Sequence, residues 1–255
     1  MKNDQNTILI TGGASGIGRA ITEAVLSEGW NAVVVDLNTK DLSLCKKELD
    51  QSSGSLLCEE LDVSDEIAVS TFVKNADKTY HPFTGVVNSA GIGKDILALD
   101  TDIAFFRRIL EVNLIGSFIV NREVTKLMIP RKKGAIVNIA SISGIIGNLG
   151  RVAYGASKGG VLNMTKVLAV EWAQAGLRVN AIAPGPIETP LVKKMHTKIA
   201  RRAWTKLVPQ GRYGSPKEIA SAALFLLDYR KSSFINGQTI AIDGGLTIGG
   251  VIKTK

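Results

Sequence analysis

The sequence predicts an α/β fold with a doubly wound, seven-stranded parallel sheet and helices on both of its faces. Two observations predict it. Short runs rich in β-branched residues alternate with longer stretches of helical periodicity, and these runs are apolar without strict alternation, as strands covered on both faces are. A glycine-rich stretch, TGGASGIG at 11–18, joins the first apolar run to the first helical stretch. The 255-residue chain has no low-complexity linker and no internal repeat, so we expect a single domain over residues 1–255.

The predicted elements follow one another in a regular rhythm. The seven strands are expected at 7–11, 31–37, 55–63, 85–91, 134–141, 178–185 and 239–245. Between the first two, one helical face carries Ile17, Ala20, Ile21, Ala24 and Val25. Gly29 is expected to end that helix. Long helices are expected at about 101–129 and 152–175, so strand, helix and strand alternate through right-handed crossovers.

Composition excludes several classes of function. The net charge is +8, but only 5% of the residues are aromatic and no nucleic-acid-binding motif is present, so we expect a solvated basic surface and no nucleic-acid partner. No apolar run approaches the roughly 20 residues that span a bilayer, so no membrane segment is expected. Cys45 and Cys58 have neither metal-ligand nor Cys-x-x-Cys spacing, which indicates ordinary buried thiols in a reducing, cytoplasmic compartment.

The glycine loop indicates a bound phosphate. Gly12, Gly16 and Gly18 lie where the first strand turns into the first helix, and the free amide groups and the helix dipole there attract a pyrophosphate if no side chain blocks its approach. A glycine cluster alone is a weak signal, but the strand before it and the helix after it are the context of a dinucleotide-binding Rossmann fold.

Asp36 bears on the choice of dinucleotide. It ends the second predicted strand, where a carboxylate accepts hydrogen bonds from the adenosine ribose hydroxyls and repels the 2′-phosphate of NADP. Neither Ser15 nor Leu37 supplies a cation for that phosphate, so NAD is the expected cofactor. Arg19 and Lys40 are close enough in sequence to keep NADP as the alternative.

A tyrosine and a lysine one helical turn apart indicate proton-transfer chemistry. Tyr154 and Lys158 share one helix face, and Ser141 ends the fifth predicted strand. A free phenol is a poor acid or base at neutral pH, but an ammonium about 4 Å away would lower its pKa. Ser141 would donate a hydrogen bond to the substrate oxygen. The Tyr213/Lys217 pair has the same spacing but is interrupted by a proline, which indicates a loop entering a helix.

From Thr7 to Gly245 the chain resembles the short-chain dehydrogenase/reductase family. The motifs that carry the resemblance are TGGASGIG, Asp62-Val63, NSAG at 88–91, Asn113, Ser141, YGASK at 154–158, PGPIET at 184–189 and DGG at 243–245. The family usually has NNAG where this chain has NSAG. The resemblance implies a catalytic set of Asn113, Ser141, Tyr154 and Lys158, with Asn113 supporting a water that links Lys158 to solvent.

The resemblance also implies how the cofactor is held. Lys158 would hold the nicotinamide ribose, Asp62 and Val63 would contact the adenine, and Ile187 and Thr189 would engage the carboxamide. The whole expected cofactor-binding set is Gly12, Ser15, Gly16, Ile17, Gly18, Asp36, Asp62, Val63, Asn88, Ala90, Gly91, Tyr154, Lys158, Pro184, Gly185, Ile187 and Thr189. The family further implies a substrate lid at about 190–208 and a homotetramer formed through the two long helices.

The resemblance leaves the substrate open. The chain is similar to NAD-dependent sugar, polyol and alcohol dehydrogenases, which interconvert a secondary alcohol and a ketone. It is also similar to NADPH-dependent 3-oxoacyl carrier-protein reductases, and cations in the 190–208 segment suit a carrier-bound thioester. A dinucleotide sensor without catalysis is a remote alternative. Asn148 and Arg151 are the polar candidates in an otherwise apolar pocket loop, which favours a substrate with few charged groups. His81 and His196 are expected on the surface, and no metal site is expected.

Overall fold

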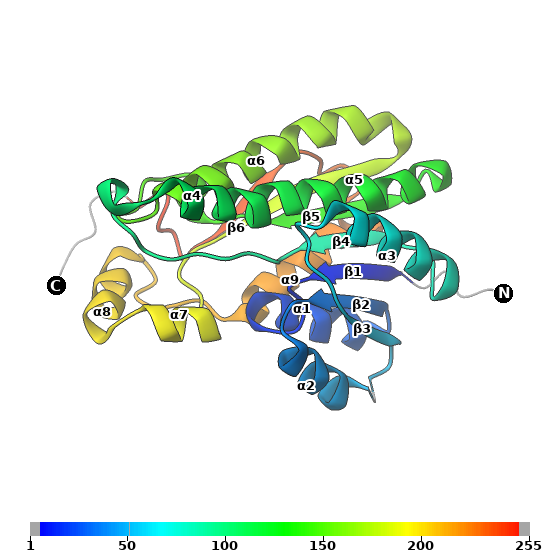
Figure 1. Ribbon diagram of the computed structural model, residues 1–255, viewed down its shortest axis with the longest axis horizontal. Helices are drawn as coiled ribbons and strands as arrows, with labels where there is room; N and C mark the ends of the chain where they lie inside the picture. Colours follow the sequence, from blue (N-terminus) through cyan, green and yellow to red (C-terminus); the bar gives the residue numbers. More distant parts are fainter. Residues whose placement is uncertain (1–5, 51, 250–255) are drawn as a thin grey trace.

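The computed structural model describes residues 6–50 and 52–249. Seven parallel strands form one sheet in the order β3-β2-β1-β4-β5-β6-β7 (Figure 1). Their bounds are β1 Thr7–Thr11, β2 Asn31–Asp36, β3 Leu56–Glu60, β4 Gly85–Asn88, β5 Gly134–Ile139, β6 Leu177–Pro184 and β7 Thr239–Ile242. The chain order reverses between β1 and β4, which are paired from Ile8↔Gly85 to Thr11↔Asn88. In an open parallel sheet, a crevice forms at the carboxyl edge at such a reversal.

Helices cover both faces of the sheet, as Figure 1 shows. On one face lie α1 Gly16–Ser27, α2 Thr39–Leu49 and α9 Pro216–Leu227. On the other lie α3 Glu66–Thr79, α4 Ile103–Leu110, α5 Ser117–Met128 and α6 Val152–Trp172. Neighbouring strand residues divide between the faces: Ile8 and Ile10 pack with α1 and α9, while Leu9 packs with α3 and α5. This two-sided burial explains why the strands are apolar without alternation.

The long helices differ from their predicted form. The stretch expected to be one helix at 101–129 is α4 and α5 joined by a π-helical turn, η2 Glu111–Gly116, and α6 gives way to a 3₁₀ turn at Ala173–Ala175. Several strands also stop before their predicted ends, β4 at Asn88 and β5 at Ile139. The residues beyond them form loops at the carboxyl edge of the sheet.

Two short helices, α7 Pro190–Met195 and α8 Lys198–Leu207, stand beyond the carboxyl ends of the strands (Figure 1). Thr189 and Thr197 cap their N-termini, each accepting a hydrogen bond from the backbone N–H three residues further on. A last short helix, α10 Tyr229–Ser232, precedes β7. Cys45 is a buried free thiol and Cys58 a half-buried one. Within residues 6–50 and 52–249, no helix has the length and apolarity needed to cross a bilayer.

Candidate active site

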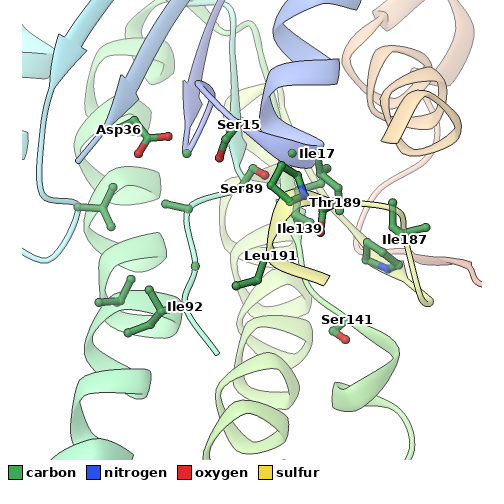
Figure 2. A pocket seen from close by; sticks show the side chains of 18 of the residues that line it. Ser15, Ile17, Asp36, Ser89, Ile92, Ile139, Ser141, Ile187, Thr189 and Leu191 are labelled. Atoms are coloured by element: carbon green, nitrogen blue, oxygen red, sulfur yellow. The ribbon is translucent and has the colours of Figure 1, made fainter. Parts of the chain in front are cut away.

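A cavity of about 350 Å³ opens at the carboxyl edge, beside the β1–β4 reversal. Loops after six strands line it, so residues far apart in sequence meet there. The predicted residues that line it are Gly12, Ser15, Gly16, Ile17, Asp36, Asp62, Val63, Ala90, Gly91, Ser141, Tyr154, Lys158, Pro184, Gly185, Ile187 and Thr189. Asp36 and Ser141 stand at opposite ends of it in Figure 2. The cavity is therefore long enough to join a site at β2 to a site at β5.

The glycine loop leaves room for an extended ligand. Gly12 and Gly16 have φ of +61° and +56°, which side chains disfavour. A Cβ on Gly12 would lie 2.8 Å from the Ala90 backbone, whereas one on Gly16 would point into the cavity and meet only Thr189 and Pro190, at 3.6 Å or more. Ser15 makes no side-chain cap, so α1 presents its first amides without a side-chain acceptor. These features fit a dinucleotide pyrophosphate at the start of α1.

The Asp36 carboxylate is held in place by two backbone N–H groups. Its Oδ2 accepts a hydrogen bond from the Ala14 N–H at 3.3 Å, and its Oδ1 accepts one from the Asn38 N–H at 3.1 Å. The guanidinium of Arg19 is already engaged, because it pairs with Glu23 and Glu48 at 2.9 Å each. Asp36 lines the cavity. The positive charge of Arg19, the cation that follows the glycine loop, is neutralised by its two glutamate partners.

Asp62, in the loop after β3, is equally fixed. Its Oδ1 accepts hydrogen bonds from the Ser64 N–H at 2.8 Å and the Ser64 hydroxyl at 2.6 Å, and Arg108 lies 3.6 Å away. Burial opposes ionisation of this carboxyl, but the Ser64 bonds and Arg108 together hold its pKa below the ordinary value. Asp62 is therefore an ionised part of the cavity wall.

Ser141, Tyr154 and Lys158 converge at the β5 end of the cavity. The Lys158 ammonium donates a hydrogen bond to the Ile139 carbonyl at 2.8 Å and lies 5.8 Å from the Tyr154 ring centroid. Burial lowers the pKa of Lys158 to about 8. The Ser141 Oγ accepts a hydrogen bond from the Ser143 N–H at 3.1 Å.

A second cation, Arg151, lies over the Tyr154 ring beside the predicted Lys158. Burial raises the pKa of Tyr154, and the groups that oppose this are the Arg151 charge and the Ser141 hydroxyl. The Arg151 guanidinium carbon lies 5.0 Å from the Tyr154 ring centroid. The Lys158 ammonium lies over the same ring and donates to the Ile139 carbonyl, and its effect on the phenol pKa stays a prediction.

Three predicted site residues lie outside the cavity wall: Gly18, Asn88 and Asn113. A Cβ on Gly18 would come within 2.1 Å of the Gly12 carbonyl oxygen, so this glycine lets α1 pack against its own loop. The Asn88 amide donates to Asn121 and Asn138, at 2.5 and 2.9 Å, inside a buried network of asparagines.

Asn113 lies in the π-helical turn and is fully buried. Its Oδ1 accepts a hydrogen bond from the Ile92 N–H at 2.8 Å, and its Nδ2 donates to the Ile92 carbonyl at 2.9 Å and to the Ser157 hydroxyl at 3.1 Å. It thus joins the loop after β4 to α6 near Lys158. A water beside Lys158 stays a prediction.

Comparison with known proteins decides the family. Residues 12–247 match the family model described as enoyl-(acyl carrier protein) reductase, one of the short-chain dehydrogenase/reductase models. The chain belongs to the short-chain dehydrogenase/reductase family. It is therefore an oxidoreductase of the kind that acts on CH–OH and ketone groups.

Relatives of this short-chain dehydrogenase/reductase differ in their substrates. The chain is 40% identical to 3-oxoacyl-(acyl-carrier-protein) reductase FabG of Thermotoga maritima, covering 97% of this chain and 100% of that protein. It is 38% identical to the L-tagatose-forming galactitol 2-dehydrogenase of Cereibacter sphaeroides, over 94% of both. Among solved structures, a single-residue variant of actinorhodin polyketide ketoreductase with NADPH is similar with a TM-score of 0.91 and 31% identity, over 96% of this chain and 98% of that one.

Sequence reasoning missed part of this short-chain dehydrogenase/reductase site. Ser89, Ile92 and Leu191 also line the cavity (Figure 2). Ser89 and Ile92 are next to predicted residues in the sequence, and Leu191 follows the PGPIET motif. This proximity to the motifs is the sequence feature that could have identified them. His196 is not a surface histidine: it is half-buried, its Nδ1 lies 2.9 Å from the Tyr213 hydroxyl, and its ring stacks on Trp204.

Two further expectations are confirmed. His81 is exposed in a loop after α3, and Tyr213 precedes α9, so the second Tyr-x-x-x-Lys is a loop entering a helix.

Within the part of the chain that the structure describes, no group of three or more His, Cys, Asp or Glu residues has a metal-ligand arrangement.

Proposed function

We propose that this short-chain dehydrogenase/reductase interconverts a secondary alcohol and a ketone with NAD(H), and that Tyr154 is its general acid and base. The observation that carries the proposal is the single cavity that has Asp36 at one end and Ser141, Tyr154 and Lys158 at the other. Asp36, a carboxylate suited to bind the adenosine ribose, and Tyr154, a group suited to transfer a proton, thus line the same cavity.

The cavity residues suit a dinucleotide along that path. The Gly12–Gly16 loop and the first turn of α1 would hold the pyrophosphate, and Asp36 would accept the ribose hydroxyls. Asp62 and Val63 would contact the adenine, and Ala90 and Gly91 the ribose. Ile187 and Thr189 would engage the carboxamide, near Pro184 and Gly185.

A bound nicotinamide dinucleotide supplies or accepts the hydride. In ketone reduction, the Ser141 hydroxyl would donate a hydrogen bond to the substrate oxygen and the Tyr154 phenol would donate the proton. In alcohol oxidation, Tyr154 would take the proton back. Lys158 would hold the nicotinamide ribose, and Asn113 would keep the loop after β4 beside it through Ile92.

The cofactor preference is tested by comparing kcat/KM for NADH and NADPH. Asp36 and the engaged Arg19 support a preference for NADH of about tenfold or more, since one lost or repelled charge contact is worth about 1.4 kcal/mol or more. Asp36→Ala should bring the two values to within a few-fold. Asp50→Ala, which removes an exposed carboxylate at the end of α2, is the matched control and should keep the wild-type ratio. A wild-type preference for NADPH would contradict the proposal.

A second candidate is an NADPH-dependent 3-oxoacyl carrier-protein reductase. The FabG relative favours it, and so does the 190–208 segment, which carries six Lys and Arg residues and no acidic one. Nicotinamide absorbance separates the candidates. Fast reduction of an acetoacetyl thioester favours the carrier-protein reductase, whereas oxidation of polyols or cyclic alcohols with NAD favours the alcohol dehydrogenase.

A further inference from the structure

We propose that Arg151 makes this enzyme selective for substrates that bear a carboxylate close to the reacting carbon, that is, for keto acids and the corresponding hydroxy acids. The inference rests on the proposed function, because it assumes that the substrate oxygen meets Tyr154. It differs from the sequence-based expectation of a substrate with few charged groups.

The guanidinium of Arg151 lies against Tyr154, beside the reacting end of the cavity; Arg151 itself lines an adjoining hollow with Asn148 and Gly155. Its carbon lies 5.0 Å from the Tyr154 ring centroid. A Cβ on Gly93 would lie 3.0 Å from Tyr154 Cδ2 and 3.5 Å from Arg151 Nη1, so the absence of a side chain at Gly93 lets the ring and the guanidinium come together beside its backbone. A group that binds both must therefore have its oxygen and its anion only a few bonds apart.

Most N–H donors of the Arg151 guanidinium are left unused by the described residues. Its Nε pairs with Asp95 Oδ1 at 2.5 Å, which accounts for one of five N–H donors. Within the described residues, the two terminal nitrogens have no hydrogen-bond partner. The Arg151 side chain is only 16% exposed, whereas Asp95 is 49% exposed. A largely buried cation with free, planar donors is a ready partner for a carboxylate, which it binds through two parallel hydrogen bonds.

The surrounding groups do not neutralise it further. Glu188, the acidic residue of the loop after β6, is paired with Arg201. His196 lies close enough for its pKa to respond to both Arg151 and Asp95: burial lowers it first, and Arg151 lowers it further. His196 is thus a neutral donor or acceptor near Arg151 and not a competing anion. Arg151 is left with the exposed Asp95 as its one charge partner among the described residues.

The proposal is tested with pairs of ketones that differ only in charge. Pyruvate, acetoacetate and levulinate are each compared with their methyl esters, so that the carboxylate moves one bond at a time away from the ketone. In the wild type, kcat/KM for the acid should exceed that for the ester by about tenfold or more at one chain length, as expected for a hydrogen-bonded charge pair. Equal or better turnover of every ester would overturn the proposal.

Variants of the arginine and its partner give effects of opposite sign. Arg151→Met should bring the acid-to-ester ratio to about one, Arg151→Lys should leave an intermediate ratio, and Asp95→Asn should raise the ratio by removing the competing carboxylate. The ratio is the readout because a change in the Tyr154 pKa alters acid and ester alike. Arg230→Met, which removes an exposed guanidinium far along the chain, should keep the wild-type ratio. An Arg151→Met enzyme with an unchanged ratio would refute the assignment.

A binding measurement separates this proposal from the proposed function. A ketone and the oxidised cofactor have no hydride to exchange, so calorimetric titration of acetoacetate and methyl acetoacetate into protein saturated with NAD⁺ reports affinity without turnover. Tighter binding of the acid that is lost in Arg151→Met supports the carboxylate site even if no ketone is turned over. Equal affinities, or no binding of the acid, overturn the carboxylate site whatever the turnover of other substrates.

Discussion

At the scale of single residues, Tyr154 is predicted to carry the proton transfer. Tyr154→Phe removes the phenol oxygen and keeps the ring that packs against Gly93 and Arg151. We expect a loss of roughly 100-fold to 10,000-fold in kcat, because that is what a positioned acid or base contributes. Binding of NADH, followed by its fluorescence, should change little. Full activity in this variant would rule out Tyr154 as the acid and base.

The buried charge of Lys158 is predicted to lower the free energy of unfolding at neutral pH. Burial lowers its pKa from 10.5 to about 8, so between these values the unfolded chain binds more protons than the folded one. The free energy of unfolding then rises with pH from about 8 to 10.5, and the cost is fully present below pH 8. Lys158→Met should therefore raise the unfolding free energy at pH 7 by on the order of 3 kcal/mol while abolishing turnover.

Thermal unfolding at pH 7 and at about pH 10.5 checks this prediction for Lys158. The gain in melting temperature should shrink at the higher pH, where the wild-type ammonium is lost in the folded state and half lost in the unfolded one. Lys166→Met, an exposed lysine of the same helix, is the control and should change the melting temperature little at either pH. A lower melting temperature of Lys158→Met at pH 7 would contradict the assignment of a destabilising buried cation.

At the scale of elements, the junction of β1 and α1 depends on Gly18. A Cβ there would come within 2.1 Å of the Gly12 carbonyl oxygen, so α1 must move away from the loop that faces the cavity. Gly18→Ala should lower the unfolding free energy by about 1–3 kcal/mol, the usual cost of overpacking, and weaken dinucleotide binding. Urea unfolding and NADH fluorescence measure the two effects.

A helical glycine of α6 provides the comparison. A Cβ on Gly159 would meet only the Gly144 carbonyl oxygen, at 3.7 Å, which is an ordinary contact. Gly159→Ala should therefore raise the unfolding free energy by up to about 1 kcal/mol, since alanine is the better helix former. Equal destabilisation by both substitutions would show that the approach of Gly18 to Gly12 has no special role.

At the scale of the whole molecule, we predict a homotetramer formed through α5 and α6. The outer faces of these helices carry exposed apolar side chains in the single chain: Phe118 is 38%, Val167 47% and Val170 79% exposed. Apolar side chains gathered on neighbouring helices mark an association surface. Sedimentation velocity should give the mass of four chains, and Val170→Glu should yield smaller species. Ile67→Glu, on α3 and also 79% exposed in wild type, should leave the mass unchanged. A wild-type monomer would refute the prediction.

The fold could be predicted from the sequence. The site residues could be predicted from it only in part. Every predicted strand is present, because each buried strand is an apolar run that can be seen locally. The ends of β4 and β5 were predicted too late, since small and apolar residues continue beyond Asn88 and Ile139. Asn113 was assigned to the site, but its bonds to Ile92 depend on a π-helical turn that periodicity does not reveal.

The sequence by itself determined the order of strands and helices, the glycine loop, the place of Asp36 and the shared helix face of Tyr154 and Lys158. Each of these depends on spacing within one element or at its end, where helix and strand geometry is set by the backbone. Only the tertiary structure decided that Lys158 is bonded to Ile139 and that the Arg151 guanidinium lies over the Tyr154 ring. Both contacts lie within the unit formed by β5, the loop after it and α6, and their distances are set by how that loop and α6 pack against the end of β5.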